Sequence, residues 1–117
     1  MNTRKTGTEY EEKAAKYLGK QGVRILEKNY RNRNGEIDLI GRDKEYLIFI
    51  EVKYRKSMKA GAPAEAVTFY KQKKICQVAD YYRLTHGIGE FCAVRYDVIS
   101  IFGEEITWYQ NAFSHIY

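Results

Sequence analysis

Two hydrophobic runs of the chain, GEIDLI and FIEVKY, contain charged residues that a plain buried strand would lack. Alternate side chains of a β-strand share a face. Glu36 and Asp38 therefore lie on one face of the first run, and Glu51 and Lys53 lie on one face of the second. Carboxylates placed close together repel one another, and burying one without a partner is costly. A divalent cation such as Mg²⁺, which takes oxygen ligands, would relieve that repulsion.

The two runs are expected to pair as an antiparallel hairpin that turns near Asp43–Lys44. A two-residue loop and a four-residue loop give the same register, in which Glu36 lies opposite Glu51 and Asp38 lies opposite Phe49. The charged residues then gather at one end of a shared face. The opposite face is wholly apolar and is expected to be core: Ile37, Leu39, Ile48, Ile50 and Val52. The alternative to a metal site is an ordinary ion-pair ladder on a solvated face.

A helix is expected over residues 8–21, ahead of these strands. Glu11 lies on the same stripe of this helix as Ala14 and Leu18, where a solvent-facing acid does not belong. Two interpretations stay open at this point. Glu11 belongs to the acidic cluster, or it forms a capping box with Thr8 at the start of the helix.

The other elements follow from hydrophobic periodicity and from turn residues. Strands are expected at 23–31, 35–42, 45–54, 90–101 and 105–113. A second helix is expected from Pro63 to about residue 85, with these residues on its buried side: Ala66, Phe69, Ile75, Val78, Ala79 and Tyr82. The order α-β-β-β-α-β-β predicts an α/β sandwich, in which helices flank a mixed central sheet. A chain of 117 residues is long enough for one such domain, residues 1–117.

Composition narrows the class of protein further. A net charge of +5 and a pI near 9.1 make nucleic acid a reasonable partner. No apolar run approaches the roughly 20 residues that span a bilayer, and the N-terminus carries no signal-peptide pattern, so we expect a cytoplasmic protein without a membrane segment. Cys76 and Cys92 lie in separate elements, which argues against a zinc site or a disulfide framework. Both are expected to be small buried side chains.

Basic residues surround the acidic cluster in the sequence. The segments NYRNR and KYRKSMK flank the two charged strands, and further lysines lie on the second helix. The residues expected to contact nucleic-acid phosphates are Arg31, Arg33, Arg55, Lys56, Lys71 and Lys74. The alternative is that they form solvated loops and a polar helix face. Tyr30 and Tyr54 either stack on bases or simply pack beside the strands.

An acidic residue in a hydrophobic strand, a hairpin, and then Glu-x-Lys in the next strand resembles the PD-(D/E)xK nuclease superfamily. Four segments together resemble the YraN-like family of small bacterial proteins: GTEYEEKAAKYLGKQGVRILEKNYRNRNGEIDLI, FIEVKYR, AVTFYKQKK and VRYDVISI. That family is similar to archaeal Holliday-junction resolvases. The resemblance implies a restriction-endonuclease-like fold of two or three layers. One departure is that Ile37, not proline, precedes Asp38.

The resemblance also implies roles for individual residues. Asp38 and Glu51 would bind a metal ion, Mg²⁺ or Mn²⁺, with the Val52 carbonyl as a further ligand. Lys53 would be the catalytic lysine, and Glu11 would be an acid supplied by the helix, near the same ion. Such a site needs no histidine and no covalent intermediate.

Three functions are weighed against one another. The leading hypothesis is a metal-dependent nuclease that hydrolyses phosphodiester bonds in DNA, branched or structured DNA included. The second is a nucleic-acid-binding module that keeps the nuclease fold and acts through partners without catalysis. The third is a structural protein whose charged cluster is an ion-pair network. Symmetric cutting of two strands would suit a homodimer, but the sequence leaves the oligomeric state open.

Overall fold

The computed structural model describes residues 3–55 and 67–117. The elements are α1 (Thr3–Lys20), β1 (Arg24–Asn32), β2 (Gly35–Asp43), β3 (Tyr46–Tyr54), α3 (Phe69–Thr85), β4 (Ala93–Phe102) and β5 (Glu105–Phe113). This order and the α/β class confirm the prediction from the sequence. None of the helices in the described ranges is long and apolar enough to cross a membrane.

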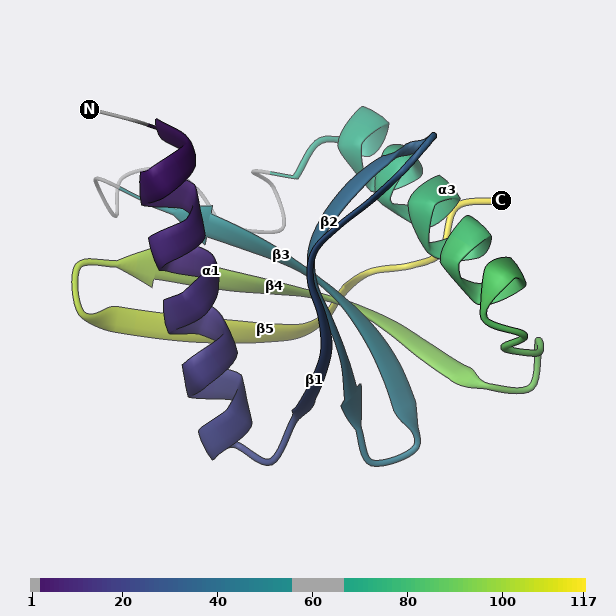
Figure 1. The fold of residues 1–117 in the computed structure, drawn as a ribbon, viewed down its shortest axis with the longest axis horizontal. Helices are drawn as coiled ribbons and strands as arrows, with labels where there is room; N and C mark the ends of the chain where they lie inside the picture. The colour runs from purple at the N-terminus through teal and green to yellow at the C-terminus, as the bar shows by residue number, and fades with distance from the viewer. Residues whose placement is uncertain (1–2, 56–66) are drawn as a thin grey trace.

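The strands form a five-stranded sheet in the order β1-β2-β3-β4-β5. Neighbouring strands are antiparallel except for β3 and β4, which are parallel. The sheet is therefore mixed, as predicted. Figure 1 shows α1 lying across the front of the sheet and α3 packed beside the β1–β2 hairpin at the other side. The arrangement has three layers, with the sheet between the two helices.

One hydrophobic core lies on each face of the sheet, and β3 contributes residues to both cores. On the α1 side, Ile48 and Ile50 pack with Leu18. On the α3 side, Phe49 packs with Tyr82 and other residues. Of the predicted buried side of α3, the described residues found in this second core are Ile75, Val78, Ala79 and Tyr82. Strand alternation thus sends odd and even residues of β3 to different helices.

Helix α1 begins at Thr3, five residues before the predicted start at residue 8. An N-cap residue lies outside the helix that it caps. Thr8 lies within α1, so the predicted capping box of Thr8 and Glu11 is wrong. Glu11 consequently has no helix-start role to explain its position on the apolar stripe.

Helix α3 begins at Phe69, and Thr68 is its N-cap residue, with Oγ1 accepting a hydrogen bond of 3.2 Å from the Lys71 N–H. The predicted start at Pro63 is wrong, since Val67 and Thr68 are not helical. Pro63 itself, and the predicted core residue Ala66, lie outside the described residues. Phe69, also predicted to be buried, is 67% exposed, because the helix starts later and turns this ring outward.

The register of β2 and β3 differs from the predicted one by two residues. Asp43 pairs with Tyr46, and Ile40 pairs with Phe49. The loop therefore consists of Lys44 and Glu45, and Lys44 adopts a φ of 55°. Glycine and asparagine take this left-handed conformation more readily than lysine does. Because neither occupies this position, the sequence did not indicate the turn. A shift of two residues does not by itself move any side chain to the other face.

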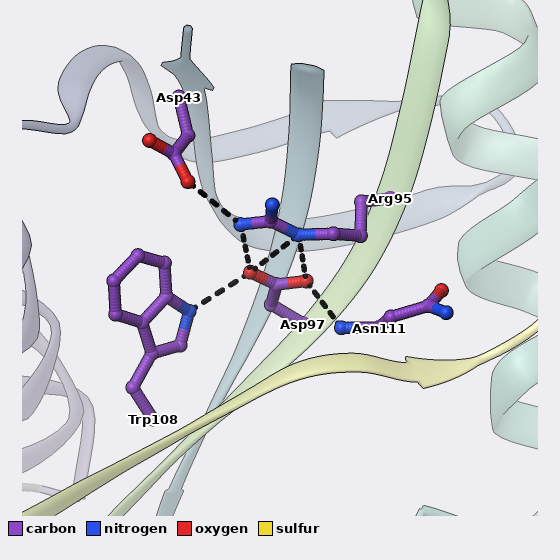
Figure 2. A network of polar contacts seen from close by, with 5 residues as sticks. All are labelled: Asp43, Arg95, Asp97, Trp108 and Asn111. Carbon is purple, nitrogen blue, oxygen red and sulfur yellow. Dashed lines mark hydrogen bonds and ion pairs between the residues drawn. The ribbon is translucent and has the colours of Figure 1, made fainter.

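Strand β5 is attached to β4 by a buried polar network around Asp97 (Figure 2). Both oxygens of Asp97 accept hydrogen bonds from Arg95, and they also accept from Trp108 Nε1 at 2.8 Å and from the Asn111 N–H at 2.9 Å. Arg95 reaches further, to Asp43 at the end of β2, over 3.1 Å. A β-bulge lies beside Asp97 in the β4–β5 pairing, so this side chain replaces part of the interrupted ladder.

The two cysteines are free thiols, as expected. Cys76 is fully buried in the α3-side core. Cys92 is only half-buried. The prediction of two buried side chains is confirmed for Cys76 and wrong for Cys92, which precedes β4 where the core ends.

Candidate active site

Strands β2 and β3 diverge beside Asp38. Their mutual pairing ends at Leu39 and Ile50, although β2 stays paired with β1, and β3 with β4, beyond that point. At this fork, Asp38 Oδ2 accepts a hydrogen bond of 2.7 Å from the Val52 N–H, in place of a backbone acceptor on β2. The divergence therefore leaves the Asp38 carboxyl group facing the gap between the two strands, and the hydrogen bond from Val52 orients it.

The bend at the fork also corrects one predicted face. Ile37 was expected to share the apolar face of Leu39. It packs instead in the α3-side core, whereas Leu39 packs in the α1-side core. Residues two apart on a regular strand share a face, so β2 must turn at the residue between them. That residue is Asp38.

A pocket of about 270 Å³ lies at the fork. Its walls come from α1, β2, the end of β3 and the first turn of α3. The lining residues are Tyr10, Glu11, Glu36, Asp38, Glu51, Val52, Lys53, Tyr54 and Lys71. The structure thus brings together all four residues that the sequence proposed as catalytic: Glu11, Asp38, Glu51 and Lys53.

Two of the carboxyl groups hold protons more tightly than usual. Burial, and then the charge of Glu51, raise the pKa of Asp38 to about 8, although the Val52 N–H bond opposes this shift. Burial also raises the pKa of Glu11, and the charges of Glu36 and Glu51 add to it. A hydrogen bond joins the Glu11 and Asp38 carboxyl groups. A proton held between them at neutral pH therefore relieves part of the repulsion.

Glu51 is only 7% exposed, and two ammonium groups approach it. Lys71 Nζ lies 2.5 Å from Glu51 Oε1, and Lys53 Nζ lies 3.8 Å from the same oxygen. Burial, and then the neighbouring Lys71, lower the pKa of Lys53. Burial also acts to lower the pKa of Lys71, but the hydrogen bond and charge of Glu51 outweigh it and raise the pKa. Lys71 thus keeps its proton, and Lys53 gives one up more readily.

The donor set suits a divalent ion, because the pocket offers the carboxylates of Glu11, Asp38 and Glu51, and Mg²⁺ and Mn²⁺ prefer oxygen ligands. Val52, whose carbonyl was the further expected ligand, lines the same pocket. Within residues 3–55 and 67–117, however, no three acidic, cysteine or histidine side chains are grouped so as to hold an ion. The residues fit such an ion chemically once the Lys71 ammonium leaves Glu51 and the proton leaves Asp38.

Five of the six residues expected to contact phosphates lie in the described part of the chain, at different positions relative to this pocket. Lys71 lines it, but in an ion pair. Arg31 pairs with Glu36 across the β1–β2 hairpin, its Nε 3.0 Å from Glu36 Oε2. Arg33 is exposed in the hairpin turn. The remaining positions are Lys74, exposed on α3, Arg55, half-buried just after β3, and Lys56, which lies outside the described residues.

Sequence reasoning missed one lining residue and one contact. Tyr10 lines the pocket from α1, and its ring stacks on that of Tyr54. Its position directly before Glu11 was the available signal. The contact between Lys71 and Glu51 had no signal, because it depends on how α3 packs against the sheet. Tyr30, for which the sequence allows either base stacking or packing beside the strands, packs edge-on against Tyr82, with ring centroids 5.1 Å apart.

Comparison with known proteins identifies the family of the chain. Residues 10–101 match the model described as Uncharacterised protein family UPF0102. The chain belongs to this family. It is the YraN-like family that the sequence motifs resemble. The matched segment of this UPF0102 protein includes every residue that lines the pocket and ends before β5.

Relatives of this UPF0102 protein match it over nearly their whole length. A UPF0102 protein of Lachnoclostridium phytofermentans is 45% identical over 113 residues, which are 97% of this chain and 96% of the relative. One of Fusobacterium nucleatum is 44% identical, over 95% of this chain and 92% of the relative. One of Clostridioides difficile is 42% identical, over 97% of this chain and 100% of the relative.

Proposed function

We propose that this UPF0102 protein is a metal-dependent nuclease that hydrolyses phosphodiester bonds in DNA. The observation that carries the proposal is the meeting of Glu11, Asp38, Glu51 and Lys53 in one pocket at the β2–β3 fork. These residues come from three separate elements. A solvated ion-pair ladder would leave Glu51 exposed, whereas it is buried.

The carboxyl groups would hold a Mg²⁺ or Mn²⁺ ion. When bound, such an ion polarises the phosphate and lowers the pKa of a bound water. Asp38 must first lose its proton, and the Val52 N–H then keeps the carboxylate pointing into the pocket. Glu11 approaches from the opposite side of the fork, on α1, and closes the acidic wall.

The two lysines suit different tasks in the hydrolysis. Lys53 has a lowered pKa, so it releases its proton more readily than a free lysine, and its neutral amine can then accept a proton from an attacking water that it holds. Lys71 stays charged and lies beside Lys53, at the same Glu51 oxygen, but it is supplied by α3. Its ammonium, once away from Glu51, is placed to stabilise negative charge on a non-bridging oxygen of the phosphate.

A second candidate is a nucleic-acid-binding module without catalysis. The observation in its favour is the ion pair of Lys71 with Glu51, which already satisfies the most buried carboxylate of the pocket. In this case the pocket would be a closed charge network and the basic flanks alone would contact phosphates.

A cleavage panel separates the two candidates. Wild-type protein is incubated with duplex, flap, four-way-junction and single-stranded DNA, and with RNA, in Mg²⁺, Mn²⁺ or EDTA. The nuclease proposal expects metal-dependent cleavage of at least one DNA that Asp38→Ala and Lys53→Ala abolish and that Glu12→Gln, an exposed change on α1, leaves intact. Binding of the panel without any cleavage would support the second candidate instead.

A further inference from the structure

One wall of the pocket is aromatic. Tyr10 of α1 and Tyr54 at the end of β3 both line it, and their rings are stacked with centroids 4.2 Å apart and planes inclined by 16°. Figure 1 shows the end of β3 running behind the N-terminal half of α1. The stack adjoins the charged residues directly in the chain, because Tyr10 precedes Glu11 and Tyr54 follows Lys53.

The ring of Tyr54 is not needed by the hydrophobic cores. Tyr54 belongs to neither of the two core clusters formed by the described residues, and it is 44% exposed. Tyr10, in contrast, packs partly against the α1-side core. Tyr10 is thus anchored and covers one face of the Tyr54 ring. The exposed part of Tyr54 is therefore the part that Tyr10 does not cover.

The opposite wall of the pocket carries two ammonium groups, both beside Glu51. Lys71 of α3 and Lys53 of β3 present their ammonium groups there. A pocket with ammonium groups on one side and a flat aromatic ring on the other matches the two parts of a nucleotide. The phosphate suits the lysines, and the planar base suits the tyrosine.

We propose that Tyr54 stacks on an unpaired nucleobase next to the phosphate that enters the pocket, so that the substrate is a nucleic acid unpaired at the cleavage position. This inference rests on the proposed function. Inside a duplex each base is covered on both ring faces by its neighbours, so a stacking residue gains nothing there. A single strand, a flap or the branch point of a junction offers an uncovered base.

The stack with Tyr10 also prepares Tyr54 for this role. A ring already held against a second ring loses little further freedom when a base binds, so more of the stacking free energy appears as affinity. The two tyrosines and the base would then form a continuous stack along the α1 side of the pocket.

The test measures binding in an Asp38→Asn background, which removes a proposed catalytic group and keeps both tyrosines. A single strand and a blunt duplex of the same sequence, each carrying 2-aminopurine, are titrated at several salt concentrations. Tyr54→Ala should weaken single-strand binding about tenfold and abolish the quenching of 2-aminopurine, with duplex binding changed by less than about twofold. Tyr54→Phe should retain both signals.

Tyr109→Ala is the matched control, because Tyr109 is 37% exposed on β5 and does not line the pocket. Where Tyr54→Ala disturbs folding, Tyr54→Leu keeps an apolar contact with Tyr10 and removes the ring. The stacking inference fails if the Tyr54 variants bind single strands as tightly as Tyr109→Ala, or lose duplex affinity equally. If such variants bind normally and the wild-type protein cleaves DNA with metal, only this inference falls. If neither the wild-type nor the Asp38→Asn protein binds nucleic acid, the proposed function falls with it.

Discussion

Asp38 combines three physical effects in one side chain. It is half-buried, it lies close to the charge of Glu51, and it accepts a backbone hydrogen bond from Val52. The first two favour the protonated acid, and the third favours the carboxylate. The first two prevail, since the pKa is raised to about 8. A residue that holds a proton in the folded protein but not in the unfolded chain makes stability depend on pH.

Asp38→Asn should therefore stabilise the metal-free protein above neutral pH. Between the unfolded pKa of 3.8 and the folded pKa of about 8, the native state binds a proton that the unfolded state lacks. The wild-type free energy of unfolding thus falls as pH rises through this window. Asparagine does not titrate, so the variant should gain about 1–3 kcal/mol over wild type near pH 8 and nothing below pH about 4. Urea denaturation at several pH values measures this.

The control for Asp38→Asn is Glu36→Gln, which changes an exposed carboxylate at the pocket rim and should stabilise the protein near pH 8 by less than Asp38→Asn does. In metal titrations, Asp38→Asn should also lose the stabilisation that Mg²⁺ or Mn²⁺ confers on wild type. A clear loss of stability in Asp38→Asn near pH 8 would favour the ion-pair network over the metal site.

Lys71→Ala should raise the affinity of the pocket for Mn²⁺. An ion that binds Glu51 must displace the Lys71 ammonium, which now lies 2.5 Å from it. Because the Lys71 side chain is 43% exposed, solvent weakens that pair, and we expect a gain of only about three- to tenfold. Mn²⁺ titration by electron paramagnetic resonance measures the affinity. Lys74→Ala, on the same helix but outside the pocket, should leave it unchanged. Equal affinities in all three proteins would mean that Lys71 does not compete.

At the scale of elements, the β2–β3 fork and the β4–β5 network lie at different places along the sheet and do different things. The fork interrupts a ladder and leaves polar groups facing a pocket. The network interrupts a ladder at a bulge and satisfies its polar groups internally. Arg95 is 8% exposed and Asp97 is 1% exposed, and each faces a charged partner. The network therefore stabilises the attachment of β5.

Asp97→Asn should destabilise the fold strongly, because it leaves the buried Arg95 with a weaker partner. We expect a loss of about 2–4 kcal/mol in the free energy of unfolding. Trp108→Phe removes one hydrogen bond to the same carboxylate and should lose about 1–2 kcal/mol. Urea denaturation of both variants and of the double variant should show non-additive losses.

Glu12→Gln, which breaks an exposed pair with Lys28, should change stability by less than about 0.5 kcal/mol. Similar small effects in all variants would contradict this role for the network.

At the scale of the whole molecule, helix packing brings segments that are distant in the sequence into contact. Figure 1 shows the β1–β2 hairpin tip beside α3, and Asn32 Nδ2 donates a hydrogen bond of 3.2 Å to the Val78 carbonyl there. Gly35, at a φ of 145°, permits this approach, since a Cβ at that position would lie 3.3 Å from Val78 Cγ2. The hairpin turn therefore lies against the middle of α3, and these two elements, which carry Arg33 and Lys74, are called the basic edge here.

Arg33→Ala and Lys74→Ala should weaken nucleic-acid binding about equally for all sequences. Both residues are exposed on that basic edge. Each lost phosphate contact should flatten the dependence of log affinity on log salt by about one unit. Fluorescence anisotropy with a junction and a duplex at several salt concentrations gives these slopes. Lys20→Ala, the same change of charge in the last turn of α1, should leave the slope unaltered.

Lys53→Ala should separate binding from cleavage in the same assays. Its binding slope should stay near that of wild type, because its role is confined to the transition state. The absence of any salt-dependent affinity in the wild-type protein would remove both the nuclease and the binding-module proposals, and the charged pocket would then be structural.

Much of the pocket followed from local pattern alone. The period of two in a strand assigned Asp38, Glu51 and Lys53 to one face, and the error of two residues in the register did not change that assignment. The apolar stripe of the first helix likewise singled out Glu11 before its neighbours were known. These features depend only on residues close together in the chain, so the sequence determined them, along with the order of elements and the α/β class.

Other features depend on contacts between distant segments, and only the tertiary structure decided them. The register needed the backbone conformation of Lys44, which its side chain does not signal. The bend that sends Ile37 and Leu39 to opposite cores comes from the divergence of β2 from β3. The partner of Glu51, and the ring that stacks on Tyr54, come from the packing of α3 and α1 on the two sides of the sheet. Periodicity places a side chain on a face, but the docking of helices decides which other side chains it meets.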